Sequence, residues 1–302
     1  MIQLKRWLVA LDRTELDETL VNYVNFISGL LKPEKIYFLH LLEKPEISED
    51  AGNELLPVDE EIETTMQKEY AHRFTDKDIE LSFEVREGNP FTATLKYYKD
   101  KKIDLVMVGR KHETRGSGML PQRLARKVPG SIIFIPDTAR PQLNHILVPT
   151  DFSDNSLEAT EEALLLARNL NHNVVIHFQH IYSVPTGYYY GGKSYEEFAA
   201  IMKGHAEKDY AKFLSKLDTA GVDTRIHYTL MEDENNNELI NQLAEEIPAD
   251  MIVMGARGKT DVAAMLLGST TEKLLRINLS VPKLIVKKKG DRMGLLDAIM
   301  NI

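Results

Sequence analysis

The sequence contains no cysteine among its 302 residues, which excludes disulfides, thiolate zinc sites and cysteine nucleophiles. It also lacks an apolar run long enough to cross a bilayer, and its first residues contain no uninterrupted signal-peptide core. We therefore expect a cytoplasmic protein without a membrane partner. Basic residues do not predominate either. The net charge of −9 argues against a nucleic-acid partner held by a broad basic surface.

What is present is typical of a folded, soluble chain. Hydrophobic residues make up 43% and charged residues 27%, the balance of an ordinary globular protein. A chain of this length can hold two domains, each of which buries its own core.

The same pattern of apolar segments occurs twice along the chain. Four pairs match in the same order and with similar spacing: 7–12 with 146–151, 36–41 with 176–181, 104–109 with 250–255, and 131–135 with 282–286. The polar, proline-bearing segment 137–142 reads as a linker between the copies. We expect an N-terminal domain over 1–138, a C-terminal domain over 143–290 and a short apolar tail over 291–302.

Within each copy, short apolar runs alternate with helical patterns. In the second copy we expect a helix capped by Ser153-Asp154, a helix from about 195 to 217 that ends near Gly221, a helix over 237–244, and a strand over 225–229. Apolar strands separated by helices indicate parallel strands that are covered on both faces. Each half is thus predicted to be an open, five-stranded, mainly parallel α/β sheet of the Rossmann-like class.

In such sheets, ligands bind beyond the carboxyl ends of the strands, where the strand order reverses. Asp151 and Gly255 each end a predicted strand, so we expect them to lie close together.

A glycine-rich segment follows the strand that ends in the second half of the chain. It reads Gly255-Ala256-Arg257-Gly258 and is followed, after nine residues, by Gly268-Ser269. Glycine permits a close approach of the backbone and often supplies a positive φ, and Ser269 with Glu272 fits a helix capping box. The pattern predicts a cradle of backbone N–H groups for phosphate. The alternative is an ordinary turn with a capped helix; a Walker P-loop is excluded because Val253 stands where that motif needs glycine.

These residues resemble a tandem universal stress protein. The ATP-binding members of that family carry G-x2-G-x9-G-(S/T), and Gly255, Gly258, Gly268 and Ser269 fill every position. The segments 149–153 and 281–286 also resemble the family, and the likeness covers roughly 3–136 and 143–288.

The resemblance implies that ATP binds to the second half. Asp151 would contact the adenosine portion, with Pro149 and Thr150 beside it, and the main chain at Ile181 would meet the adenine edge. The remaining implied contacts are with ribose and phosphates: Gly255, Gly258, Gly268, Ser269 and Thr270 through backbone and hydroxyl groups, Arg257 and Lys259 through charge. Mg²⁺ or Mn²⁺ would accompany the triphosphate, with ligands supplied largely by the nucleotide. The alternative for Asp151 is a helix-capping role.

The first half departs from the motif. Gly109 remains, but His112 stands in place of the second glycine, and Pro121-Gln122 occupies the approximate place of Gly-Ser. Proline lacks an N–H group, so we expect this half to bind ATP poorly or not at all. Asp12 is then a vestige or a helix cap. In the alternative, 116–118 (Gly-Ser-Gly) form a substitute cradle.

The histidines and a tyrosine-rich segment have less specific readings. His177 and His180 are an odd number of positions apart on a predicted strand, so they face opposite sides and do not share a metal. We interpret these two and His40, which has no acidic partner in sequence, as structural or exposed. The tyrosine-rich segment 187–192 is read as a connection, with a lid or a partner-contact loop as alternatives.

The favoured function is an ATP-binding stress-response module whose nucleotide state alters its shape or partners. Turnover would also need a group that orients the attacking nucleophile, and Asp261 is a candidate only by proximity in sequence. We predict no catalytic residue. A slow ATP hydrolase or autophosphorylating enzyme, and a nucleotide-free scaffold, are the alternatives. The resemblance further implies that the two halves pair within one chain, which could then form a homodimer; the sequence names no protein partner.

Overall fold

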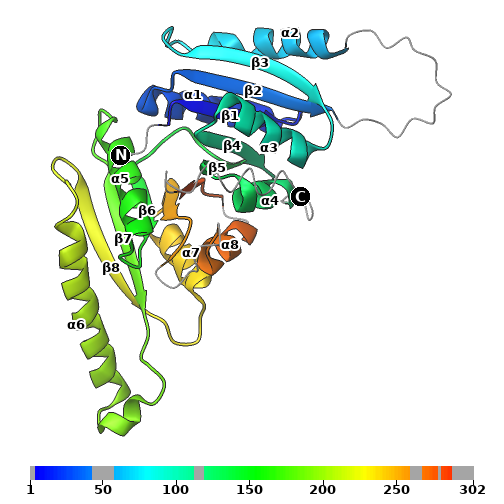
Figure 1. The fold of residues 1–302 in the computed structure, drawn as a ribbon. Coiled ribbons are helices and arrows are strands. Elements are labelled where there is room, and N and C mark those ends of the chain that lie inside the picture. Colours follow the sequence, from blue (N-terminus) through cyan, green and yellow to red (C-terminus); the bar gives the residue numbers. More distant parts are fainter. Residues whose placement is uncertain (1–3, 43–57, 112–118, 259–266, 278–279, 288–302) are drawn as a thin grey trace. The chain divides into compact units, whose positions relative to one another are not determined.

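The computed structural model describes residues 4–42, 58–111, 119–258, 267–277 and 280–287. The chain divides into two compact units, one that extends to Pro141 and one that begins at Gln142 (Figure 1). Several predictions fall outside the described residues: those on His112, 116–118, Lys259, Asp261 and the tail 291–302.

The N-terminal unit alternates strands and helices. In chain order they are β1 (Arg6–Leu11), α1 (Leu16–Leu31), β2 (Lys35–Leu42), α2 (Val58–Tyr70), the 3-10 turn η1 (Ala71–Arg73), β3 (Glu80–Glu87), α3 (Pro90–Lys101), β4 (Leu105–Arg110), α4 (Met119–Lys127) and β5 (Ser131–Pro136). The strands lie in the order β3-β2-β1-β4-β5, and every neighbouring pair is parallel.

The C-terminal unit repeats this arrangement. Its elements are β6 (His145–Pro149), α5 (Asp154–Arg168), β7 (Val175–Tyr182), the 3-10 turn η2 (Tyr188–Gly191), α6 (Tyr195–Leu214), β8 (Asp223–Leu230), α7 (Asn236–Glu246), β9 (Met251–Gly255), α8 (Ser269–Arg276) and β10 (Lys283–Val286). The order β8-β7-β6-β9-β10 is again parallel throughout. The predicted fold class, two open five-stranded parallel sheets, is confirmed.

Helices cover both faces of the second sheet. Successive side chains of a strand point to opposite faces, and in β7 each face contacts a different helix. Phe178 contacts Tyr210 and Phe213 of α6, whereas the neighbouring Gln179 donates from Nε2 to the Leu239 carbonyl of α7. α6 and α7 therefore lie on opposite faces of β7, and Figure 1 shows α6 running along β7 and β8. β9 is buried over its whole length, as a central strand covered on both sides must be.

The ends of α5 and α6 show which of the predicted capping residues cap these helices. Ser153 caps α5 by accepting from the Ser156 N–H, as predicted, and α6 begins with a full capping box of Ser194 and Glu197. The predicted start of α6 at about 195 is confirmed, but the predicted end at about 217, near Gly221 as the C-terminal cap, is not. The helix ends at Leu214, and Gly221, with φ of 78°, makes the left-handed turn that leads into β8.

The strand order places the predicted site. β6 lies between β7 and β9: the chain passes from β6 to β7 and β8 on one side and then returns to β9 on the other side of β6. Asp151 follows β6 and Gly255 ends β9. Both residues thus lie at the carboxyl edge where the strand order reverses, which is where open α/β sheets bind ligands.

Candidate functional site

A cavity of about 410 Å³ lies at this edge of the C-terminal unit. Ten of the eleven predicted site residues line it: Pro149, Thr150, Asp151, Ile181, Gly255, Arg257, Gly258, Gly268, Ser269 and Thr270. The eleventh, Lys259, is outside the described residues. The cavity is also lined by residues that were not predicted to belong to the site: Ser156, Gln179, His180, Asn236, Ile240, Met254 and Thr271.

Asp151 is held at the start of α5. Its Oδ1 accepts from the Ser153 N–H at 3.0 Å and from the Ser156 hydroxyl at 2.7 Å. Ser153 is the N-cap of α5, so the alternative interpretation of Asp151 as the residue that caps this helix is wrong. Ser156 was missed because only the first turn of the helix brings a residue five positions later back to the strand end.

The turn between β6 and α5 is stabilised by β7. The Thr150 N–H donates to the Gln179 carbonyl at 2.8 Å, and His180 Nδ1 lies 2.9 Å from the Thr150 carbonyl, to which it must donate. Phe152 adopts a φ of 62°, and its ring stacks on His180 at 4.3 Å. The structural interpretation of His180 fits these contacts, and the same side chain also lines the cavity.

Gly255 is required by packing. A Cβ at this position would lie 2.8 Å from the Asn155 carbonyl oxygen of α5, closer than real Cβ atoms come. The Gly255 carbonyl in turn accepts from the Thr271 hydroxyl at 3.1 Å, which ties the end of β9 to α8. Close approach of helix and strand is therefore sufficient reason for glycine here, independently of any ligand.

Gly268 corrects two predictions. Gly268, rather than Ser269, is the N-cap of α8, and glycine has no side chain to accept from the first turn, so the predicted capping box of Ser269 and Glu272 does not form. Its φ of −75° is one that any residue adopts, so a positive φ does not explain this glycine. Its N–H donates to the Ala256 carbonyl at 2.7 Å and is not directed at a ligand. The N–H groups left without an intrahelical partner are those of the first helical turn, which begins at Ser269.

Two basic side chains, Arg257 and Lys287, follow β9 and β10. Arg257 lines the cavity, and Lys287, 4% exposed, follows β10, the strand beside β9. Burial and then the Arg257 charge lower the pKa of Lys287 to about 7. Among the described residues that line the cavity, Asp151 is the single carboxylate. Because a helix N-terminus also attracts anions, this end of the cavity favours negative charge.

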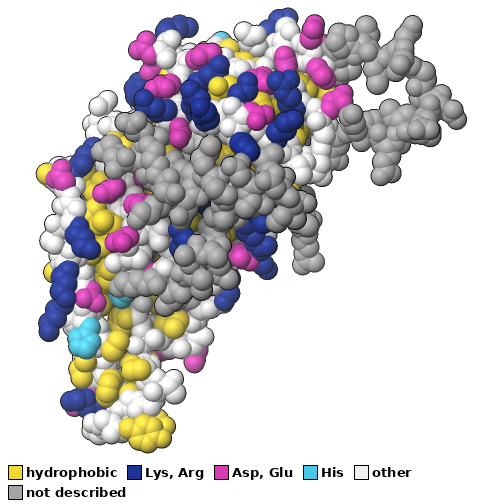
Figure 2. Space-filling view, viewed as in Figure 1, with side chains coloured by type: hydrophobic (Ala, Val, Ile, Leu, Met, Phe, Trp, Pro, Cys, Tyr) yellow, Lys and Arg dark blue, Asp and Glu magenta, His cyan; other side chains and the backbone are white. Residues whose placement is uncertain are grey.

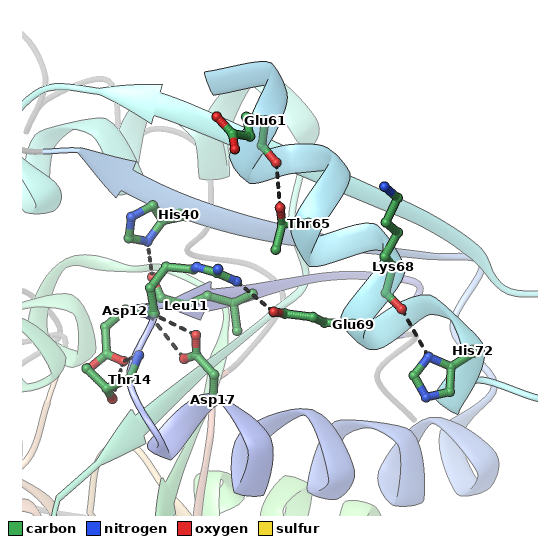
Figure 3. Close-up of polar contacts among 11 residues, drawn as sticks. Leu11, Asp12, Thr14, Asp17, His40, Glu61, Thr65, Lys68, Glu69 and His72 are labelled. Carbon is green, nitrogen blue, oxygen red and sulfur yellow. Dashed lines mark hydrogen bonds and ion pairs between the residues drawn. The ribbon is translucent and has the colours of Figure 1, made fainter. Parts of the chain in front are cut away.

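The equivalent edge of the N-terminal unit differs in charge (Figure 3). The Asp12 N–H lies 3.1 Å from Asp17 Oδ1, just as the Asp151 N–H meets the Ser156 hydroxyl, so a buried carboxyl replaces a neutral hydroxyl. Burial raises the pKa of Asp17 to about 6. Arg13, in the place of Phe152, pairs with Glu69 of α2 at 2.8 Å. A second carboxyl group makes this edge less suited to an anion.

Other features of the N-terminal edge are shared with the second copy. His40 Nδ1 meets the Leu11 carbonyl at 3.0 Å, as His180 meets that of Thr150, which gives His40 a structural role (Figure 3). Asp12 accepts from the N–H and hydroxyl of Thr14 and does not cap α1, whose N-cap is Glu15. The reading of Asp12 as a helix cap is therefore wrong.

The alignment of Pro121-Gln122 with Gly268-Ser269 is also wrong. α4 begins at Met119 and α8 at Ser269, so Pro121 corresponds to Thr271 in the first helical turn. The buried pairs Leu124–Ala125 and Leu274–Leu275 agree with this register. The residue without an N–H group, Pro121, is thus the third residue of α4, in its first turn.

Three histidines that are distant in sequence form one row across β6, β7 and β8. His145 Nδ1 lies 3.1 Å from His177 Nε2, and His177 Nδ1 lies 3.0 Å from His227 Nε2. His177 is 3% exposed, and burial, followed by the two flanking imidazoles, lowers its pKa to about 4. Its role is structural, as interpreted. Among the described residues, no group of three or more His, Asp or Glu side chains is placed to hold a metal ion.

The tyrosine-rich segment forms η2, bounded by Gly187 and Gly192, both with positive φ. Tyr189 and Tyr190 are 59% and 86% exposed. Figure 2 shows an apolar area at the lower end of the C-terminal unit, where Figure 1 places the beginning of α6, and interspersed acidic and basic side chains elsewhere on the described part of that face. Within the described ranges, none of the helices combines the length and apolar character that crossing a bilayer requires.

Comparisons with known proteins agree with the internal duplication. The model of the universal stress protein family matches residues 3–131 and 142–287. Universal stress protein MJ0531 of Methanocaldococcus jannaschii is 34% identical over 146 residues, which cover 47% of this chain and 81% of that protein. Universal stress protein E of Photorhabdus laumondii is 24% identical over 227 residues, 70% of this chain and 71% of that protein.

A solved structure resembles the whole fold. A universal stress protein from Archaeoglobus fulgidus superposes with a TM-score of 0.63 over 96% of this chain and 98% of its own, at 18% identity. At that identity the likeness concerns the fold alone. With the family model matched across both halves, the chain belongs to the universal stress protein family and carries its domain twice.

Proposed function

We propose that the chain is a nucleotide-dependent regulatory module that binds ATP in the cavity of its C-terminal unit. The observation that carries the proposal is the convergence of ten motif residues from β6, β7, β9 and α8 on one cavity. The strand order brings residues 149–151 and 181 to the same edge, and the glycine segment lines the space that they enclose.

The cavity has two chemically different ends, as a nucleotide does. From β7 and α7 it is lined by the apolar Ile181 and Ile240 together with the polar Gln179 and Asn236, a combination that suits a base with polar edges. Toward α8 it offers the uncapped helix start at Ser269 and the charge of Arg257, which suit phosphates. A divalent ion brought by the triphosphate would take most of its ligands from phosphate oxygens, with the hydroxyls of Ser269 and Thr270 nearby.

The same residues favour binding over turnover. Asp151, the carboxylate among the described lining residues, already accepts two hydrogen bonds that hold it against α5. The described lining residues supply no second carboxylate to orient an attacking water. Slow hydrolysis is the second candidate, and ADP release by the wild type compared with a Gly268→Glu variant tests it. Equal rates would assign the activity to a contaminant.

The experiment for binding has two parts. Mass spectrometry of the denatured protein identifies nucleotide that co-purifies, and calorimetry with ATP measures binding to the emptied chain. Gly268→Glu places bulk and negative charge at the first turn of α8 and should abolish binding. Gly29→Glu adds the same side chain to an exposed position of α1 that has nothing within 4 Å, and should leave binding unchanged.

Two results would contradict the proposal: no calorimetric signal with ATP in a nucleotide-free preparation, or unchanged affinity in Gly268→Glu. The first would favour the nucleotide-free scaffold. Pairing of the two halves and formation of a homodimer stay predictions, and sedimentation analysis tests the latter.

A further inference from the structure

Gln179 is a polar side chain in a position that the fold fills elsewhere with an apolar one. It is 1% exposed and lines the cavity. In the N-terminal unit the matching position, in the repeat of 36–41 with 176–181, is Leu39, which is also 1% exposed. Packing of this strand therefore requires only a buried side chain of about this size, and the amide of Gln179 needs another reason.

The orientation of that amide is fixed by the two acceptors to which its nitrogen donates. Nε2 donates to the Leu239 carbonyl at 3.0 Å and to the Thr229 hydroxyl at 3.2 Å. A backbone carbonyl can only accept, so the nitrogen and not the oxygen must face it. Thr229 lies on β8 and Leu239 on α7, so Nε2 is directed at these two elements. Oε1 takes no part in these bonds, and Gln179 is one of the residues that line the cavity.

Among the residues that the structure describes, none is a hydrogen-bond partner of Oε1. A buried acceptor without a partner is destabilising, and native proteins retain one rarely and for a reason. A ligand that donates a hydrogen bond at this point would satisfy the oxygen. Because both amide hydrogens are already directed at protein acceptors, the side chain presents acceptor character only.

We propose that Gln179 selects the base of the bound nucleotide: its Oε1 accepts from an amino group at the end of the cavity lined by Ile181 and Ile240, the 6-amino group of adenine. This inference rests on the proposed function and specifies recognition at the same site. A purine with a carbonyl at position 6 would set oxygen against oxygen, and discrimination of this kind is strong because it leaves buried polar groups unpaired.

The test compares ligands that differ only at position 6. Calorimetry of the intact, nucleotide-free chain is performed with ATP, with purine riboside triphosphate, which lacks the amino group, and with inosine triphosphate, which has a carbonyl there. The wild type should bind ATP about tenfold more tightly than purine riboside triphosphate, the worth of one hydrogen bond, and inosine triphosphate more weakly still.

Gln179→Leu is the informative variant, since the sister unit carries leucine at this position. It should bind ATP about tenfold more weakly, leave purine riboside triphosphate unchanged and so lose the preference. The variant loses both the unpaired acceptor and the two bonds donated by Nε2, so its thermal unfolding midpoint serves to show that it is folded. Thr229→Val removes one of the two bonds that hold Nε2 and should reduce the preference only in part.

The outcomes separate the two proposals. If the wild type binds none of the three triphosphates, the proposed function fails and this inference with it. If the wild type binds all three equally, or if Gln179→Leu keeps the wild-type preference, nucleotide binding stands and the role of Gln179 is refuted.

Discussion

Acidification from pH 7 to pH 5 should weaken the C-terminal unit through His177. The folded unit holds this imidazole neutral, with a pKa lowered from 6.5 to about 4 by burial between His145 and His227. At a pH between these two pKa values the unfolded chain binds the proton and the folded chain does not, so the free energy of unfolding falls as the pH falls. The difference amounts to about 2 kcal/mol at pH 5. The lowered pKa of His227 acts in the same direction.

The charges around the row do not reverse this sign. Arg225 of β8 lowers the pKa of His177 further, Asp223 raises it, and Glu246 of α7 raises that of His227. Burial is the largest cause for both imidazoles, so the net direction is downward. The effect is expected to persist in moderate salt, since buried groups are screened little.

Urea unfolding at pH 5, 6 and 7 measures this effect. His177→Gln keeps a donor and an acceptor between the flanking rings but cannot take up the proton, so it should lose about 2 kcal/mol less than the wild type on acidification. His205→Gln, an exposed position on α6, serves as the control. Circular dichroism follows both units. Trp7, the single tryptophan, lies in β1 and reports the N-terminal unit alone.

The N-terminal unit should respond with the opposite sign. Burial raises the pKa of Asp17 to about 6, so the folded unit binds its proton more tightly than the unfolded chain does, and stability is lost as the pH rises toward 6. Acidification from pH 7 to pH 5 should thus raise the free energy of unfolding of the N-terminal unit, as Trp7 reports it, by about 1 kcal/mol. Asp17→Ser, the residue of the second copy, should abolish the gain. Parallel pH responses of the two units, or a wild-type response in His177→Gln, would refute the reasoning.

Further predictions concern glycine and lysine positions in the C-terminal unit. Gly255→Ala should destabilise it by roughly 1–3 kcal/mol in urea unfolding, because the new Cβ meets the Asn155 carbonyl. Gly204→Ala, in α6 with nothing within 4 Å, should instead stabilise it by up to about 1 kcal/mol; a loss in both variants would contradict the packing argument. The lowered pKa of Lys287 implies that stability rises with pH from 7 to 10.5, since the unfolded chain binds the proton there. In Lys287→Met that rise should disappear, and an unchanged slope in a pH series of unfolding midpoints would exclude this lysine as its source.

The sequence determined the architecture and the place of the site because both depend on local patterns. Short apolar runs separated by helical periodicity define parallel strands, and two copies in one order define two sheets. Asp151 and the glycine segment each follow a strand directly, so the chain itself places them at the carboxyl edge. The cap at Ser153 was predictable for the same reason, since its bond reaches only three residues along the helix.

Only the tertiary structure decided which distant side chains meet. The histidine row and the clamp on the Gln179 amide join neighbouring strands and α7, so they depend on register and helix position, which strand periodicity does not encode. The glycine motif shows the same division. Its spacing marked the site, but the reason for each glycine lies in the tertiary structure. At Gly255 the Asn155 carbonyl of α5 excludes a Cβ. Gly268 has an extended backbone and is the N-cap of α8.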